Sequence, residues 1–340
     1  MECVETKARL STTAIAAAFG LRRVIRVRRL RNSPLGTILL ETARGRFVVR
    51  RLPPRSDHEL KRNAQFLVYM RQHGCPVLAP LTDRNGRYWY GLGPVLWSVH
   101  PVREWRLRPL DPNHPPHLRA LGESMARYHL AGRGYRKSGE TRHTPERLTQ
   151  LWAAIRPLMP SFLARTTRAL DEETEYLAWA LDLTKLPRGP LLLDMDPQRF
   201  CFQGDRLITV LHCDPDCRGP YIFDLAQAVN RLCFSQGSYD PSRFETLVRA
   251  YDAFRLLALL EWDVFPNALR FSAARFLIVG LQRVFLDQTE SWAAFESRFH
   301  PWFERLRILR REVDGRFGTL RNFMATGYEY RRYQRIREIP

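Results

Sequence analysis

Two aspartates in one stretch of the chain are of a residue type that can serve in acid–base chemistry. Asp194 lies in the run Leu-Leu-Asp-Met-Asp-Pro, and Asp224 lies in the run Phe-Asp-Leu-Ala. A carboxylate can accept the proton of a hydroxyl group, which is the acid–base step of phosphoryl transfer. Segment 192–224 is therefore the candidate catalytic segment.

This segment resembles the catalytic core of the aminoglycoside-phosphotransferase and protein-kinase-like superfamily. The family pattern is roughly H-G-D-L-H-P-x-N, then a short hairpin, then V-I-D-F-D-D-A-C-R-G-P-x-x-Y-D-L-A. Here the first part reads Leu-Leu-Asp-Met-Asp-Pro-Gln-Arg, and the last part ends in Cys-Arg-Gly-Pro-Tyr-Ile-Phe-Asp-Leu-Ala. The resemblance implies that Asp194 is the catalytic base and that Asp224 braces the catalytic loop.

Two metal-binding positions of the family carry unsuitable residues in this chain. The resemblance puts Arg199 at the metal-binding asparagine and His212 at the metal-binding aspartate. A guanidinium has no acceptor lone pair, and Mg²⁺ prefers oxygen ligands over imidazole. We expect neither residue to bind magnesium. Asp214 and Asp216 are the nearby carboxylates that could substitute.

The nucleotide-binding positions are altered as well. The strand Phe-Val-Val-Arg-Arg places Arg50 where the family has its phosphate-binding lysine, and the resemblance places Asn63 at the partner glutamate. Arginine keeps the charge but presents a planar fork instead of a compact ammonium. Glu59 lies one helical turn before Asn63 and is an alternative partner.

A second resemblance concerns the helix that ends in Arg-Gly-Tyr. Residues 121–135 look like the first large-lobe helix of the CotS-type bacterial spore-coat proteins, and His129 fits their helix histidine. The resemblance implies a coat or coat-associated protein with protein partners in that assembly. A histidine that is merely packed within the helix is the alternative interpretation of His129.

Composition limits the class of protein. The chain has 340 residues, of which 45% are hydrophobic and 26% charged, as expected for a globular protein with one or two lobes. We find no uninterrupted apolar run of about 18 residues and no secretory signal, which predicts a cytoplasmic protein, possibly one that is later delivered to the spore coat. The six cysteines do not form a disulfide framework, and zinc at His212, Cys213 and Cys217 is only a weak alternative.

The net charge of +19 comes almost entirely from arginine. Basic residues cluster in residues 22–31 and 331–337, and such patches attract polyanions or acidic surfaces. A polyanion-binding module is therefore a further hypothesis. An arginine bias spread over the whole composition would explain the same residues without any function.

The order of predicted elements favours an α+β, bilobal, protein-kinase-like fold. We predict a small antiparallel-sheet lobe over residues 1–98, a mainly helical lobe over 99–327 and a basic arm over 328–340. Within the first lobe the order is a short helix, three strands, a helix from Ser56, and two strands, with a hairpin turn at Asn85-Gly86. The predicted helices of the second lobe cover residues 118–131, 145–159, 170–183, 222–234, 242–257, 269–286 and 292–313.

The altered positions favour a degenerate, kinase-like protein that acts by binding partners, with no cofactor expected. The alternative is an active ATP-dependent kinase that phosphorylates a small-molecule hydroxyl, with Asp194 as base and with ATP and Mg²⁺ as cofactors. A Mg·ATP complex that binds weakly or not at all would favour the first interpretation.

Overall fold

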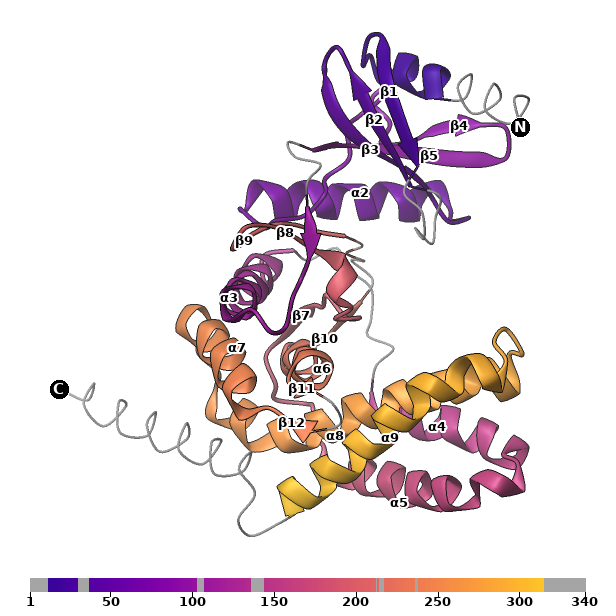
Figure 1. Ribbon diagram of the computed structural model, residues 1–340, viewed down its shortest axis with the longest axis vertical. Helices are drawn as coiled ribbons and strands as arrows, with labels where there is room; N and C mark the ends of the chain where they lie inside the picture. Colours follow the sequence, from indigo (N-terminus) through magenta and orange to yellow (C-terminus); the bar gives the residue numbers. More distant parts are fainter. Residues whose placement is uncertain are drawn as a thin grey trace, which may run out of the picture. The chain divides into compact units, whose positions relative to one another are not determined.

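The computed structural model describes residues 12–29, 37–102, 107–135, 144–211, 213, 217–235 and 238–314. The chain forms two compact units. Unit 1 comprises Met1–Leu110, Gly134–Lys137 and Gln198–Pro215, and unit 2 comprises Asp111–Arg133, Ser138–Pro197 and Asp216–Pro340. The predicted α+β, kinase-like fold is confirmed, with an antiparallel sheet in unit 1 and helices in unit 2 (Figure 1). The predicted boundary at residue 98 and the arm over 328–340 stay predictions.

Unit 1 contains an antiparallel sheet with the strand order β1-β2-β3-β5-β4. The Asn85-Gly86 dipeptide forms a tight turn in which the Gly86 amide bonds the Asp83 carbonyl, but the β4–β5 hairpin reverses farther on, between Leu92 and Val95. The strand bounds are β1 Val24–Arg29, β2 Ile38–Thr42, β3 Gly45–Arg51, β4 Tyr90–Leu92 and β5 Val95–Val102.

Alternation along β3 and β5 separates an apolar face from a polar one. Val49 pairs with Val99, and both belong to the apolar cluster that includes Ile15 of the helical residues 12–18 and Phe19, which follows them. Successive strand residues point to opposite faces. Arg50 and its cross-strand partner Ser98 therefore lie on the other face of the sheet.

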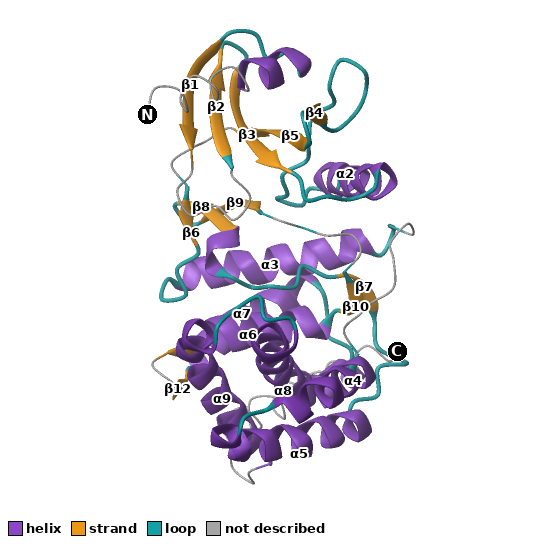
Figure 2. Cartoon of the chain, turned by 90° about the vertical axis from the view of Figure 1, so that its right-hand side faces the viewer, coloured by secondary structure: helices purple, strands orange, loops and turns teal. Residues whose placement is uncertain are grey.

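Helix α2 (Asp57–Gln72) lies beside the sheet within unit 1 (Figure 2). It begins where predicted, because Ser56 and Glu59 form a capping box in which each side chain bonds the other residue's backbone amide. The buried residues of this helix include Leu60 and Phe66. Unit 1 also holds the short sheet of β6 Arg108–Pro109, β8 Phe200–Gln203 and β9 Arg206–Val210.

Unit 2 is built from helices packed in pairs (Figure 2). α3 packs along α7, α6 and α9 both pack along α8, and α4 packs along α5. Two short strands, β7 and β10, pair antiparallel ahead of α6. The helix bounds are α3 Pro115–Gly132, α4 Pro145–Ile155, α5 Ala164–Ala180, α6 Ile222–Leu232, α7 Pro241–Phe254, α8 Leu259–Leu281 and α9 Trp292–Asp314. The smaller elements are η1 Arg156–Leu158, η2 Ser161–Leu163, η3 Pro197–Arg199, η4 Gln282–Leu286, β7 Arg188–Pro190, β10 Arg218–Pro220, β11 Phe234–Ser235 and β12 Ser238–Tyr239.

Helix α8 begins ten residues earlier than predicted, because the helix continues through Pro266. A proline inside a helix removes one backbone hydrogen bond, and here tertiary packing outweighs that loss. By length and composition alone, Leu259–Leu286 could cross a membrane, but 72% of its apolar window is buried within the structure. A core helix accounts for this pattern, and the expectation of a chain without a membrane span stays a prediction.

A buried ion pair joins α5 to α8. Arg270 donates to both carboxylate oxygens of Glu173 at 2.8 Å, and both side chains are almost fully buried. The Arg270 guanidinium also lies over the ring of Tyr176. If one of the two residues were removed, the other would remain as a buried charge with little contact to water. We therefore expect the fold to be less stable when only one of them is replaced.

We expect Glu173→Gln to lower the free energy of unfolding by about 3–5 kcal/mol, because it leaves Arg270 as a buried charge without its carboxylate. The double variant Glu173→Met, Arg270→Met should lose much less. Urea unfolding of unit 2 measures both. Glu245→Gln, which breaks the exposed pair with Arg249, is the control and should lose less than about 1 kcal/mol. A double variant as unstable as the single one would contradict this account.

Candidate functional site

The predicted catalytic loop follows β7 in unit 2. Strand β10 pairs with β7 and leads into α6, and the Leu191 amide donates to the Cys217 carbonyl at 2.7 Å. This pairing brings the residues after β7 next to the first turn of α6, where Asp224 lies. Two segments thirty residues apart in sequence thus meet at one point.

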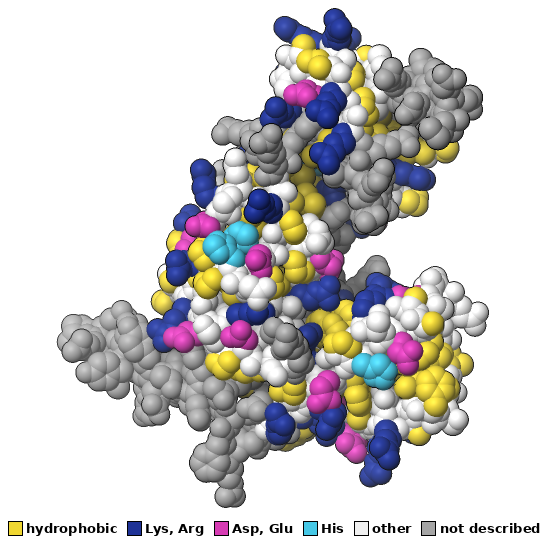
Figure 3. Space-filling view, viewed as in Figure 1, with side chains coloured by type: hydrophobic (Ala, Val, Ile, Leu, Met, Phe, Trp, Pro, Cys, Tyr) yellow, Lys and Arg dark blue, Asp and Glu magenta, His cyan; other side chains and the backbone are white. Residues whose placement is uncertain are grey.

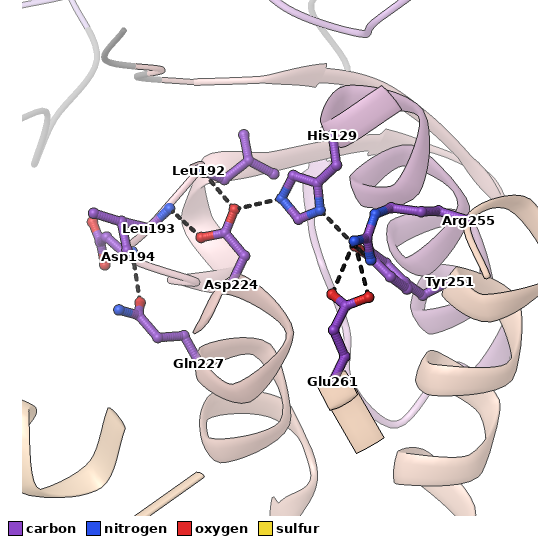
Figure 4. A network of polar contacts seen from close by, with 9 residues as sticks. All are labelled: His129, Leu192, Leu193, Asp194, Asp224, Gln227, Tyr251, Arg255 and Glu261. Atoms are coloured by element: carbon purple, nitrogen blue, oxygen red, sulfur yellow. Dashed lines mark hydrogen bonds and ion pairs between the residues drawn. The ribbon is translucent and has the colours of Figure 1, made fainter. Parts of the chain in front are cut away.

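Asp224 holds the backbone of this loop (Figure 4). Its carboxylate accepts the Leu192 amide at 2.6 Å and the Leu193 amide at 2.8 Å, and its side chain is fully buried. Leu193 and Asp194 have φ values of 42° and 50°, which lie in the left-handed region. Such conformations cost energy in residues other than glycine and persist where neighbouring groups enforce them. The two hydrogen bonds to Asp224 supply that enforcement.

The side chain of Asp194 is left exposed by this arrangement. Its own amide donates to the Gln227 side-chain oxygen at 2.9 Å, one helical turn after Asp224 on α6. The loop is therefore fixed through three consecutive backbone amides, while the Asp194 carboxylate projects from it.

His129 of α3 completes the support of Asp224. Its Nε2 lies 2.9 Å from the Asp224 carboxylate and its Nδ1 lies 2.7 Å from the Tyr251 hydroxyl. Arg255 donates to that hydroxyl, so the Tyr251 proton points to Nδ1 and the imidazole proton lies on Nε2. Arg255 in turn binds both oxygens of Glu261. All the hydrogen bonds from Glu261 to Asp224 can form when the His129 imidazole is neutral.

Burial determines the charge of His129. Burial holds the pKa of the ring below its ordinary value, although the hydrogen bond that the ring donates to Asp224 and the charge of that carboxylate act in the opposite direction. Tyr221 stacks on the ring with centroids 4.4 Å apart. His129 is therefore a structural group behind the loop, and the interpretation as a packed histidine agrees with its contacts.

A cavity of about 330 Å³ in unit 2 is lined by the loop. Its walls include the carboxylates of Asp194 and Asp196 and apolar groups from α8 and α9. Four guanidinium groups also line it, those of Arg231, Arg275, Arg283 and Arg298. Cationic groups outnumber anionic ones, which suits a small ligand that carries negative charge as well as a hydroxyl.

Two of these arginines are paired with carboxylates. Arg231 bonds Asp196 at 3.0 Å, and Arg298 pairs with Glu290. The pKa of Arg275 is lowered to about 10, mainly by burial and also by the charge of Arg283, while Cys217 and Asp194 act in the opposite direction. Arg275 is thus partly desolvated and close enough to Asp194 to interact with its charge. No sequence motif pointed to Arg275 of α8. Arg283 lies in the π-helical turn Gln282–Leu286, a kind of turn that is common at functional sites.

Unit 1 contains a separate cavity of about 270 Å³. Arg50, Ser98 and His100 line it from the polar face of the sheet, and Asn63 and Leu67 line it from α2. Val210 and Cys213 also contribute. The structure therefore brings together Arg50 and Asn63, two of the predicted nucleotide-site residues.

Glu59, the alternative partner, is occupied elsewhere in the described structure. Its carboxylate accepts the Ser56 hydroxyl at 2.7 Å and the Ser56 amide at 2.9 Å, and the hydroxyl contact lowers the pKa of Glu59. A role for Glu59 beside Arg50 stays a prediction.

Arg50 and Arg199 are electrostatic neighbours in unit 1. Both side chains are buried, with 9% and 8% exposed. Burial lowers the pKa of Arg50 to about 10, the thiol of Cys213 opposes this effect, and the charge of Arg199 adds to it. The Arg199 Nε donates to the Leu211 carbonyl at 3.0 Å, which fixes the plane of its guanidinium.

The family's metal positions do not fit Mg²⁺ in the part of the chain that the structure describes. Arg199 has only donors to offer. His212, Asp214 and Asp216 lie outside the described residues, as do the basic residues 331–337. The five described cysteines form no disulfide with one another.

Comparison with known proteins identifies the family. Residues 26–262 match the model of the phosphotransferase enzyme family. The chain belongs to this family. It is 26% identical to a homoserine kinase of Methylobacillus flagellatus over 277 residues, 81% of this chain and 83% of the relative. It is 29% identical to a homoserine kinase of a Caulobacter species over 293 residues, 82% of this chain and 87% of the relative.

Solved structures of small-molecule kinases share the fold. A microcompartment-associated aminopropanol kinase superposes with a TM-score of 0.69 and 16% identity, covering 92% of this chain and 99% of that chain. An amicoumacin kinase bound to AMP-PNP and Ca²⁺ gives a TM-score of 0.67 at 14% identity, covering 89% and 95%.

These relatives correct the function expected from the altered motifs. The curated relatives are named as homoserine kinases, so the hypothesis of a degenerate, non-catalytic spore-coat protein is wrong. The loss of two family metal-binding residues at Arg199 and His212 does not by itself show a loss of activity. The match extends over most of the chain and favours the active-kinase alternative.

We expect the stability that His129 contributes to disappear as the pH falls. The folded pKa of His129 is depressed, so its contribution is present above about pH 6.5 and is lost as the pH falls below that value, where the unfolded chain takes up a proton first. The difference in free energy of unfolding between wild type and His129→Gln should shrink from pH 7.5 to 5.5, by at most about 1.4 kcal/mol per pH unit.

Urea unfolding at the two pH values measures this difference. The exposed His300 provides the control, since His300→Gln should leave the pH dependence nearly unchanged. A difference that grows as the pH falls would show that His129 is charged in the folded protein.

Proposed function

We propose that this protein is an ATP-dependent kinase that phosphorylates the hydroxyl of a small, carboxylate-bearing substrate, with homoserine as the first candidate. The observation that carries the proposal is the exposed Asp194 carboxylate, which projects into an arginine-rich cavity from a loop fixed by Asp224. Family membership and the names of the curated relatives support the same class of reaction.

Asp194 is the proposed general base. A base must lie within reach of the hydroxyl proton and keep a constant position while the bond to phosphorus forms. The backbone of Asp194 is held by Gln227 and by the two preceding amides on Asp224. Leu192 and Leu193 support this geometry through their amide groups, so their apolar side chains do not prevent it.

Arg275 is the proposed contact for the substrate carboxylate. Its guanidinium lines the same cavity as Asp194, and a planar fork suits a carboxylate. Asp194 and Arg275 together would set the distance between the reacting hydroxyl and the acidic group of the substrate. Homoserine carries both groups and fits a cavity of this volume.

ATP is the proposed phosphoryl donor, with its phosphates near Arg50 in the unit 1 cavity. Magnesium, when bound, would neutralise phosphate charge, and Asp214 and Asp216 are the proposed oxygen ligands. Because ATP is the co-substrate, we propose a cytoplasmic location.

The finer resemblance to CotS-type proteins concerns fifteen residues and adds no function to this proposal.

Arginine and lysine side chains are dispersed over the face shown in Figure 3. Binding of an acidic or polyanionic surface by residues 22–31 stays a prediction.

With Mg²⁺ present, we expect the protein to form ADP from ATP in the presence of L-homoserine. Asp194→Asn should lower kcat by about 10²–10⁴-fold, because it removes the proton acceptor, and should leave ATP affinity unchanged. A coupled assay of ADP release measures the rate. Asp263→Asn, an exposed aspartate on α8, is the matched control and should retain activity. Asp194→Asn with more than a third of wild-type activity would exclude the assigned role.

We expect Arg275→Met to raise KM for homoserine at least tenfold, because the substrate carboxylate loses its guanidinium contact. Turnover of an amino alcohol without a carboxylate should change little. The exposed Arg165→Met on α5 is the control for lost charge. Equal effects of Arg275→Met on both substrates would show that Arg275 supports the fold of the cavity and does not recognise the carboxylate.

A further inference from the structure

The carboxamide of Gln227, on α6, uses only one of its two ends to hold the loop. Its Oε1 accepts the Asp194 amide at 2.9 Å. A backbone amide can only donate, so the atom that it contacts must be the oxygen, and this fixes the orientation of the carboxamide. Among the residues that the structure describes, none makes a hydrogen bond to Nε2. The two N–H groups of Gln227 are therefore available to a ligand.

This nitrogen belongs to the cavity of unit 2, which Gln227 lines together with Asp194. Nε2 and Oε1 share one carbon atom, so the nitrogen also lies close to the Asp194 backbone. In Figure 4 the Gln227 nitrogen and the Asp194 carboxylate both lie on the side away from His129. A small group that contacts the Asp194 carboxylate can therefore also reach Gln227.

Ser272 of α8 carries an uncharged hydroxyl at the same cavity. Its Oγ is inaccessible to solvent and makes no hydrogen bond in the described part of the chain, and the residue is 5% exposed. Gln227, in contrast, is only half-buried. The carboxamide of Gln227 is therefore the neutral group that a ligand can reach without a rearrangement.

The reacting hydroxyl of the proposed substrate can use such a donor. A hydroxyl group donates one proton and accepts at two lone pairs. When Asp194 takes the proton, one lone pair attacks the γ-phosphorus of ATP and the other can accept from Gln227. Because Nε2 only donates, the hydroxyl proton turns toward Asp194. A guanidinium at this place would also donate, but its charge would lower the pKa of Asp194 and make it a weaker base.

We propose that Gln227 contacts the substrate and orients its reacting hydroxyl, with Nε2 donating to the hydroxyl oxygen while Oε1 holds the Asp194 amide. The inference rests on the proposed function, in which Asp194 is the base. One carboxamide then positions both the base and the nucleophile. The distance between these two groups depends on a single side chain of α6.

Gln227→Glu separates the two contacts. At pH 8 the glutamate still accepts the Asp194 amide, but it has no N–H group for the hydroxyl. Calorimetry of the full chain measures the dissociation constants of L-homoserine and of L-2-aminobutyrate, which is homoserine without its hydroxyl. The ratio of the second constant to the first measures what the hydroxyl contributes to binding. Repulsion between the new carboxylate and the ligand carboxylate affects both constants and cancels in the ratio.

We expect this ratio to fall about three- to tenfold in Gln227→Glu, the usual effect of one lost neutral hydrogen bond. The kcat for ADP release should fall at least as much. Gln227→Met, which adds no charge, is the second variant and should lower the ratio at least as far. Gln150→Glu makes the same change of charge at an exposed site on α4 and should keep the wild-type ratio and rate. Circular dichroism checks that the variants are folded.

The assay of homoserine phosphorylation separates this inference from the proposed function. Turnover by the wild type, together with an unchanged ratio in Gln227→Glu, would leave the kinase function intact and overturn the contact to Gln227. A wild-type protein that neither binds nor phosphorylates homoserine would overturn the proposed substrate and this inference together.

Discussion

The buried carboxylate of Asp224 is the interaction on which the candidate catalytic loop depends. It accepts hydrogen bonds from two consecutive loop amides and from His129, and it lies in the first turn of α6, where the helix dipole favours negative charge. These bonds, together with the bond from the Asp194 amide to Gln227, hold Leu193 and Asp194 in left-handed backbone conformations. The Asp224 carboxylate thus stabilises the loop conformation in which the Asp194 side chain is exposed.

A series of hydrogen bonds within unit 2 runs from Glu261 to His129 and supports the Asp224 carboxylate. Glu261 fixes Arg255, Arg255 fixes the Tyr251 hydroxyl, and the hydroxyl fixes the tautomer of His129 (Figure 4). These bonds join α8, α7 and α3 to the loop. A network of this kind in a buried site is strong when every member is satisfied and specifies one arrangement.

Arginine stands at two positions where the resembled family has other residue types. Arg50 stands at a lysine position and Arg199 at an asparagine position, and both are buried in unit 1. The charge of Arg199 lowers the pKa of Arg50, so the two substitutions influence each other electrostatically. The chain belongs to the phosphotransferase enzyme family and its curated relatives are named as kinases, so the altered residue types do not by themselves show a loss of activity.

The sequence by itself predicted the kinase-like fold and the capping of α2, because these depend on element order, alternation and cap chemistry, and its resemblance to the family pointed to the loop around Asp194. It could not place the start of α8 at Leu259, since propensity alone predicts a break at Pro266 and only packing compensates for it. It also missed Arg275 and the effect of the Arg199 charge on Arg50. These two residues are 149 positions apart in the sequence and influence each other only in the folded chain, which no local pattern encodes.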